Sequence, residues 1–455
     1  MEKFTINFNN VIGNIKPMHA VGQPPFLGMD FTYCKYLQDA NIPYSRLHDV
    51  GGRYGRNEFV DIPNIFRDFN ADETDPNSYD FEKTDYLIAQ LYKYNCPPIF
   101  RLGVTIENDI LLGFKPKRIM PPADFNKWAR ICEHIIMHYN EGWANGFTYG
   151  ITYWEIWNEP DNRHIPEINQ MWSGTKEQYY ELYVVTATHL KNRFGNSIKV
   201  GGYASTGFYN IFNNNQEYNK RYGLNLPYRD GDRYDHDRVK YRLTFAYEFF
   251  DYIKKHNAPL DFFSWHSYIG SEETAMMAVY VDKLLKEQGY PNAESHLNEW
   301  NDTARIPNSF GTSFASAQAT QMLLLLQNTP TDMLCYYDAK IGLGSYGGMF
   351  NPITRTPTPL YYAFKAFGHL YTLKNQVQVL GGKNGIYAVG ATNGKDNAVM
   401  ISNTTVNCAT IKTNLDGNYE IYLIDEKQPI TLTNYSADSF KIKKNQVILI
   451  KNKAI

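Results

Sequence analysis

One stretch of eight residues constrains the fold of this chain more than any other: positions 153–160 read YWEIWNEP. Its aromatic and β-branched side chains are typical of a buried strand. The strand ends at Pro160, which has no N–H to continue a ladder. Glu159 then lies at the tip of a buried strand beside Trp157, where little water solvates it. We therefore predict a raised pKa for Glu159, which suits a general acid, although a surface glutamate after a core strand has the same local sequence.

A second stretch has the same form. Positions 294–301 read ESHLNEWN, a short strand that ends in a carboxylate beside tryptophan. Its Glu299 follows Glu159 by 299 − 159 = 140 residues, which leaves room for the intervening strand–helix units of a barrel. Carboxylates at the C-terminal ends of two barrel strands can face one substrate, and glycosidic bond cleavage needs such a pair.

The rest of the chain supplies the other strands of that barrel. Amphipathic helix patterns alternate with short apolar runs, and this alternation predicts a parallel barrel with its site at the strand C-termini. The eight predicted strands are 17–22, 43–49, 97–103, 153–160, 198–203, 260–268, 294–301 and 333–338. A polar segment at 209–240 is predicted to be an inserted loop. After a closing helix at 361–371, short alternating runs separated by Asn and Gly turns predict a β-sandwich.

Composition narrows the function class. A net charge of −2 gives no bias toward nucleic acid or an anionic membrane, and the hydrophobic content of 43% allows a large core. The five cysteines have no metal spacing and are expected to be reduced thiols. The first residues lack the apolar core of a signal peptide, so we expect a cytoplasmic protein, although a trimmed chain would look the same.

On these residues the chain resembles glycoside hydrolase family 39, the β-xylosidase and α-L-iduronidase family among the barrels with paired glutamates. The resemblance covers most of residues 15–370. It rests on Arg46-Leu47-His48, Trp157-Asn158-Glu159-Pro160, His266-Ser267-Tyr268 and Asn298-Glu299-Trp300-Asn301. It implies an α/β fold, a (β/α)8 TIM barrel with a C-terminal β-sandwich domain. The expected domains are an N-terminal strand at 1–15 that joins the sandwich, the barrel at 16–372 and the sandwich at 373–455.

The resemblance also implies roles for individual side chains. Glu159 would be the acid/base and Glu299 the nucleophile, and Asn158 would bind the sugar 2-OH. Tyr268 would hydrogen-bond or orient Glu299. The remaining substrate-binding candidates are His48, His266, Trp300, Tyr337 and Lys340, with Asp49 and Asp338 as weaker ones. A histidine at a strand tip is as often structural as functional.

Strand eight departs from the family pattern. Xylosidases of the family carry a Trp there and then an Asp-x-Phe-Glu-Glu stretch that binds the terminal sugar. Here positions 336–344 read YYDAKIGLG, so the glutamate pair is missing and the stretch contains a lysine, Lys340. Leu343 and Gly344 stand near the place of the lost acceptors. We therefore expect xylose to be a poor substrate, or to share the site with arabinose, galactose or a uronate, unless other loops replace the contacts.

The function that follows is a retaining exo-glycosidase that releases terminal sugars, β-xyloside-like or related, from plant-type oligosaccharides, without metal or cofactor. Two alternatives stay open at this point. A catalytically silent carbohydrate-binding barrel would need one glutamate out of position. A metal-dependent barrel hydrolase would need clustered histidines on strand one, where His19 stands alone. The expected partner is a glycoside, with no nucleic acid and no membrane. The sequence leaves open the sugar, the anomer, whether internal bonds are cut, and the formation of homo-oligomers.

Overall fold

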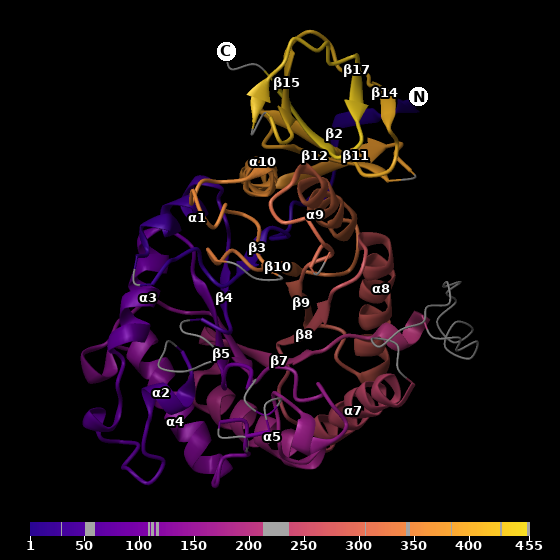
Figure 1. Ribbon diagram of the computed structural model, residues 1–455. Coiled ribbons are helices and arrows are strands. Elements are labelled where there is room, and N and C mark those ends of the chain that lie inside the picture. The colour runs from indigo at the N-terminus through magenta and orange to yellow at the C-terminus, as the bar shows by residue number, and fades with distance from the viewer. Residues whose placement is uncertain are drawn as a thin grey trace.

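A computed structural model describes residues 1–28, 30–50, 60–107, 110, 113–114, 118–212, 236–304, 306–342, 346–383, 385–427 and 430–452. Eight parallel strands close into a barrel (Figure 1), in the order β10-β3-β4-β5-β6-β7-β8-β9. Their bounds are β3 Ala20–Gly22, β4 Ser45–Leu47, β5 Pro98–Leu102, β6 Tyr153–Ile156, β7 Lys199–Ser205, β8 Phe262–Ser267, β9 Glu294–Trp300 and β10 Met333–Tyr337.

Helices cover the outside of this barrel (Figure 1). They are α1 Lys35–Asp39, α2 Ile62–Ile65, α3 Glu82–Lys93, α4 Phe125–Asn140, α5 Lys176–Phe194, α7 His236–Lys255, α8 Ser271–Gln288, α9 Ser313–Leu326 and α10 Pro359–Leu373. Local sequence fixes where several begin. At α5, Thr175 and Gln178 form a reciprocal capping box that satisfies free backbone N–H groups. No described helix combines the length and the apolar character that a membrane crossing requires.

The inside of the barrel is layered. A small apolar layer, made by Ala20, Ile99, Tyr153, Phe262, Met333 and Cys335, fills one end. Next comes a polar layer in which Arg46 of β4 bonds Glu155 of β6, and Glu155 in turn accepts from Ser264 of β8. Because side chains alternate along a strand, Trp154 points the other way and stacks on Phe100 in the core between strands and helices. This polar layer lies directly below the C-terminal ends of the strands and supports the side chains at those ends.

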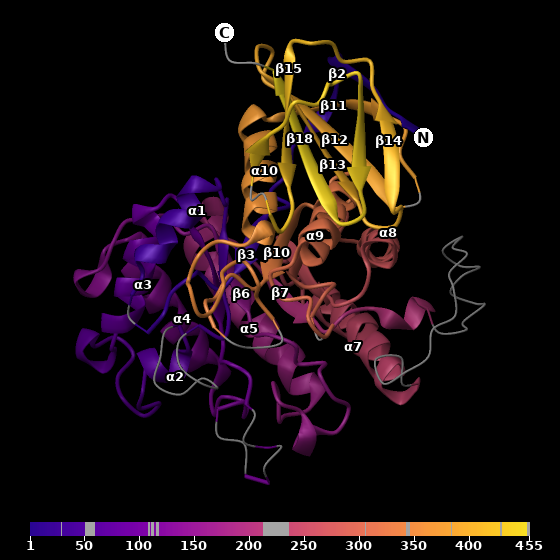
Figure 2. The ribbon, with the colours of Figure 1, turned by 45° about the horizontal axis from the view of Figure 1, so that its top comes forward.

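The C-terminal residues form a β-sandwich that rests on α9 and α10 (Figure 2). One sheet has the order β16-β15-β18-β13-β12-β11-β2 and the other β1-β14-β17. The strands are β1 Glu2–Lys3, β2 Thr5–Asn14, β11 Asn375–Leu380, β12 Ile386–Thr392, β13 Asn397–Asn403, β14 Cys408–Lys412, β15 Tyr419–Ile424, β16 Thr431–Leu432, β17 Ser439–Lys443 and β18 Gln446–Asn452. Both sheets therefore include strands from the first fourteen residues, and β2 pairs antiparallel with β11.

The predicted fold class, a TIM barrel followed by a β-sandwich, is confirmed. The predicted loop at 209–240 is wrong at both described ends, because a 3-10 turn occupies Tyr209–Phe212 and α7 already begins at His236. The polar start of α7 shows no apolar period, so the sequence pattern did not reveal it. Residues 213–235 of that segment, and Leu343 and Gly344 of strand eight, lie outside the described residues.

Candidate active site

Glu159 lies just beyond the end of β6, on a turn with unusual backbone angles. Trp157 has φ 70° and Glu159 has φ 45°, a left-handed conformation that non-glycine residues adopt only when their surroundings enforce it. Here the Trp157 indole donates to the Met171 carbonyl at 2.7 Å, and the Glu159 N–H donates to Ala204 O at 3.1 Å. The turn leaves the Glu159 side chain 11% exposed and in contact with groups at the C-terminal end of the barrel.

Glu299 lies near the end of β9, in register with His266 of β8. Its Oε1 accepts a hydrogen bond from the Tyr268 hydroxyl, and its Oε2 lies 3.2 Å from Nη1 of Arg46. The Glu299 side chain is 10% exposed. A phenol and a guanidinium thus fix the Glu299 carboxylate, and the Tyr268 contact is the one that the family resemblance implies.

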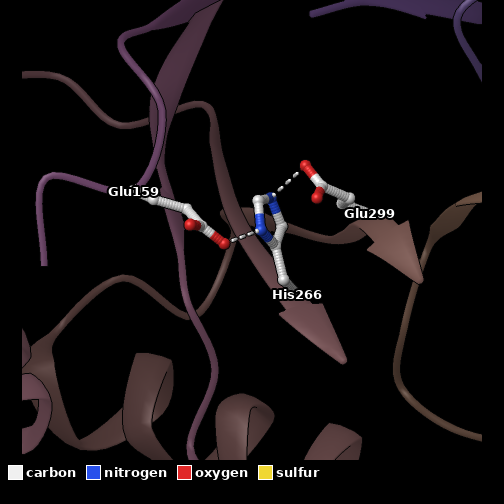
Figure 3. Close-up of side chains that lie close together, drawn as sticks. All are labelled: Glu159, His266 and Glu299. Atoms are coloured by element: carbon white, nitrogen blue, oxygen red, sulfur yellow. Dashed lines mark hydrogen bonds and ion pairs between the residues drawn. The ribbon is translucent and has the colours of Figure 1, made fainter. Parts of the chain in front are cut away.

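His266 lies between the two glutamates (Figure 3). Its Nδ1 is 2.7 Å from Oε1 of Glu159, and its Nε2 is 3.6 Å from Oε2 of Glu299. One oxygen of Glu159 and one of Glu299 lie within 4.8 Å of each other. The two carboxylates predicted from the sequence are therefore brought together, with an imidazole that touches Glu159 and approaches Glu299.

Arg46 connects the pair to the polar layer below. It is fully buried, its Nε donates to Glu155 Oε2 at 2.7 Å, and its Nη2 donates to Asn158 Oδ1 at 2.6 Å. These bonds fix the Asn158 amide, whose Nδ2 has no hydrogen-bond partner among the described residues and can donate to a ligand. Asn298 also donates to Glu155. A buried cation with a carboxylate on two sides holds both the nucleophile candidate and Asn158 in place.

The predicted rise in the pKa of Glu159 is wrong for this structure. Burial raises the pKa, but the hydrogen bond and charge of His266 and the hydrogen bond from Asn162 outweigh burial and hold it below its ordinary value. For Glu299, burial and the nearby Glu159 charge outweigh the opposing His266 and raise the pKa. Burial lowers the pKa of His266, yet the two carboxylates raise it above its usual range. The sequence did not reveal this imidazole beside Glu159.

The other predicted binding residues, which lie just beyond β4 and on β10, form a second group. His48 Nε2 lies 3.2 Å from Asp49 Oδ1, and the Tyr337 hydroxyl donates to Asp49 Oδ2 at 2.8 Å. Gln23, absent from the predicted set, donates to the Tyr337 hydroxyl at 2.8 Å. Burial and the nearby Arg101 charge lower the pKa of His48 well below its usual range, so this imidazole is neutral.

A wall of three tyrosines joins this group to the catalytic pair. The Tyr346 ring lies 5.4 Å from Tyr268 and 5.1 Å from Tyr337, measured between ring centroids. Tyr268 bonds Glu299, so the wall runs from the β8 tip to the β10 tip. Tyr346 was missed because nothing in its local sequence distinguishes it from other loop tyrosines.

Two residues predicted to bind substrate, Trp300 and Lys340, do not lie between the two glutamates. Trp300 is fully buried, and its ring packs on Tyr336 and Phe364 between the barrel and α10, so the structure does not bring it to the site. Lys340 places Nζ 5.8 Å from the ring centre of Phe26, and its backbone N–H donates to Asp338 Oδ1 at 3.1 Å. Lys340 thus lies beside the second group of residues and not between the glutamates.

Two more carboxyl groups near the strand ends are buried. Burial raises the pKa of Asp338 to about 7, against the opposing charge of Lys340. Burial also raises the pKa of Asp302 to about 7, against the weaker effect of its own backbone N–H, and its carboxylate oxygens are buried without a hydrogen bond to any other described residue. The rest of the Asp302 residue is partly exposed, but the charge-bearing atoms are not.

Metal binding has one candidate within the described ranges. Glu159, His266 and Glu299 are the grouping of His, Cys, Asp and Glu in this part of the chain whose donor atoms are spaced for a shared ion. Arg46, only 3.2 Å from Glu299, opposes a cation there. The arrangement suits proton transfer and nucleophilic attack without a metal.

Comparison with known proteins gives a consistent result. The model of the glycosyl hydrolases family 39 matches residues 33–308. A β-xylosidase of Geobacillus stearothermophilus is 27% identical over 169 residues, which cover 35% of this chain and 31% of that protein. A β-xylosidase of Caldicellulosiruptor saccharolyticus is 22% identical over 371 residues, 74% of this chain and 66% of its own length. The chain therefore spans less than two thirds of each of these relatives.

Solved structures share the whole fold. A glucosidase from Croceicoccus marinus superimposes with a TM-score of 0.78 at 20% identity, over 100% of this chain and 99% of that one. A family 39 β-xylosidase from Caulobacter crescentus gives a TM-score of 0.67 at 15% identity, over 100% of both chains. At these identities the likeness concerns the fold.

Proposed function

Because the chain belongs to glycosyl hydrolase family 39, we propose that it is a retaining exo-glycosidase that uses Glu299 as nucleophile and Glu159 as acid/base. The observation that supports this most directly is the short separation of the two carboxylates, whose nearest oxygens lie within 4.8 Å. A retaining pair is about 5–5.5 Å apart, whereas an inverting pair is about 6.5–9.5 Å apart to admit a water. The short separation of this pair therefore favours the retaining arrangement.

The surrounding contacts fit these roles. Attack by Glu299 on the anomeric carbon requires an ionised, oriented carboxylate, and Tyr268 and Arg46 hold it. Glu159 must bring a proton to the departing oxygen, and the His266 imidazole, whose pKa the two carboxylates raise, lies 2.7 Å away and can supply one. When a sugar displaces water, the proton passes from Nδ1 of His266 to Glu159 and on to the leaving oxygen. Glu159 then takes a proton from the water that hydrolyses the glycosyl-enzyme ester.

For the sugar we propose a xyloside-like or related terminal residue, in line with the β-xylosidase relatives. The strand-eight departure argues for a second sugar. Arabinose, galactose or a uronate are the candidates, because the glutamate acceptors are missing and Tyr337, Asp338 and Lys340 stand in their region.

The proposal is tested with nitrophenyl glycosides of xylose, arabinose, galactose and glucuronic acid, assayed with and without EDTA. Activity that EDTA leaves unchanged is expected, and loss with EDTA would favour a metal-dependent hydrolase. No turnover of any glycoside would favour a silent carbohydrate-binding barrel. Proton NMR of the first-formed sugar should show the anomeric configuration of the substrate, and an inverted sugar would rule out the assigned pair. A xyloside preference above about a hundredfold, roughly 2.7 kcal/mol, would show that strand eight does not alter the sugar.

A further inference from the structure

A hollow of about 660 Å3 lies at the end of the barrel opposite the catalytic pair. Its lining includes Pro43 and Tyr44, which directly precede β4, whereas the catalytic groups lie at the C-terminal ends of strands. The end of β2 and the C-terminal ends of α1, α3 and α10 supply the rest of the lining. Sites for small ligands have volumes of about 300–1,000 Å3, so the hollow has the size of a binding site. A ligand there would not compete with a substrate between the two glutamates.

Several polar side chains of this hollow have no partner within the protein. The amides of Gln38, Asn41 and Asn95 are exposed and make no hydrogen bond to another described residue. The phenols of Tyr44 and Tyr371 are half-buried, and they too bond no other described side chain or backbone group. Burial raises the pKa of Tyr44, and the neighbouring Tyr371 hydroxyl raises it further. The hollow therefore offers hydrogen-bond donors and acceptors beside two aromatic rings.

The charge of the lining favours an uncharged ligand. Among the described residues that line the hollow, Lys374 is the charged one. A cationic ligand would face this ammonium group without a carboxylate to bind it. An anionic ligand could bind Lys374 but would also face the C-terminal ends of α3 and α10, where the helix dipole is negative. A neutral ligand with many hydrogen-bonding groups meets neither penalty.

Sugars have this chemistry, because they combine hydroxyl groups with apolar C–H faces. Side-chain amides can bond the hydroxyl groups, and tyrosine rings can pack against the C–H faces. A wholly apolar ligand would instead take the amides out of water without a partner, which costs free energy. We propose that this hollow is a second carbohydrate-binding site, which holds a neutral oligosaccharide or a segment of a neutral polysaccharide away from the catalytic pair. Binding there keeps further chain ends close to the enzyme.

The variant Asn41→Gly/Asn95→Gly removes two of the amides and leaves the backbone unstrained. Both asparagines have left-handed backbone angles, with φ 51° and 55°, which glycine adopts readily. Asn257→Gly is the matched control, because Asn257 is also an exposed asparagine, with φ 51° after the end of α7, and lies outside the hollow. Both changes are introduced into Glu299→Gln, so that the sugar probes are not hydrolysed during the measurement.

Affinity electrophoresis measures binding, in gels that contain arabinoxylan, galactan or mixed-linkage β-glucan, with polygalacturonate as the anionic comparison. At least one neutral polysaccharide should retard Glu299→Gln. The loss of two hydrogen bonds in Asn41→Gly/Asn95→Gly should raise its Kd at least about fivefold, and Asn257→Gly should stay within about twofold. With Glu299 intact, the double variant should keep the kcat/KM of the wild type on nitrophenyl glycosides, because these small substrates do not reach the hollow.

Four results would overturn the second site. They are no retardation by any neutral polysaccharide, the same Kd in the double variant and the control, tighter binding of polygalacturonate, and a matching fall in kcat/KM on nitrophenyl glycosides. The binding measurement does not depend on turnover. Failure of the wild type to hydrolyse any glycoside would therefore overturn the proposed function and leave the test of the hollow intact.

Discussion

Replacing Asp302 with asparagine should stabilise the protein above neutral pH and have much less effect in acid. Both carboxylate oxygens of Asp302 are buried and bond no other described residue, and burial raises its pKa from 3.8 to about 7. A carboxyl group with a raised folded-state pKa favours the folded state in its neutral form. Its ionisation removes stability as the pH rises from about 4 to about 7, and the loss is complete above that.

The two pKa values set the size of this effect. One pKa unit corresponds to about 1.4 kcal/mol. Through this linkage, ionisation of Asp302 lowers the free energy of unfolding of the wild type by about 2 kcal/mol at pH 5 and by about 4 kcal/mol at pH 8, relative to strongly acid pH. Asp302→Asn keeps the shape and removes the charge, so its advantage over the wild type should grow by between 2 and 3 kcal/mol from pH 5 to pH 8. For a domain of this size that is a shift in Tm of roughly 3 °C.

The assay is thermal or urea unfolding of both proteins at the two pH values. Subtracting the variant from the wild type cancels the other titrating groups, which both chains share. Asp416→Asn, at an exposed carboxylate, is the control and should show no growing advantage. If the advantage of Asp302→Asn is the same at pH 5 and pH 8, the buried carboxyl does not titrate between them, and the reasoning from burial fails.

Two further predictions concern the catalytic pair. Glu299→Gln removes the attacking anion and keeps the shape, so kcat should fall by several orders of magnitude with an unchanged Tm; more than about a tenth of the activity remaining would place the nucleophile elsewhere. Glu159→Ala should slow disaccharides more than nitrophenyl glycosides, because a good leaving group needs no proton, and azide should restore part of the turnover. Equal losses on all substrates without an azide effect would make Glu159 structural.

The sequence predicted the architecture because its strands carry strong local signals. The run that ends at Glu159 is aromatic and β-branched, whereas the run that ends at Glu299 is marked only by its carboxylate beside Trp300; the two strands bring the carboxylates together. Period-two alternation would also have excluded Trp300, since a side chain next to an inward-facing Glu299 points outward. That step was missed because the resemblance placed Trp300 within a catalytic motif.

The electrostatic interactions of the site could not be predicted from the sequence. Arg46 stood in a quoted motif, but only the fold shows its guanidinium between Glu155 and Glu299. The pKa of Glu159 was predicted from burial alone, and its direction depends on His266, 107 residues away in the chain. Contacts across the barrel of this kind follow from strand order and register, which a single sequence does not specify.

The N-terminal strand β2 has a consequence for how the chain is made. Ile6 donates to Asn414 at 2.7 Å and accepts from it at 2.9 Å, across 408 residues. During synthesis β2 therefore lacks its partner β11 until the whole barrel has been made, and β1 lacks its partner β14 until part of the sandwich has followed. Closing so long a loop is slow, although each further doubling of its length costs only about 0.6 kcal/mol. The sandwich therefore cannot complete its sheets before both strands that precede the barrel and strands that follow it are present.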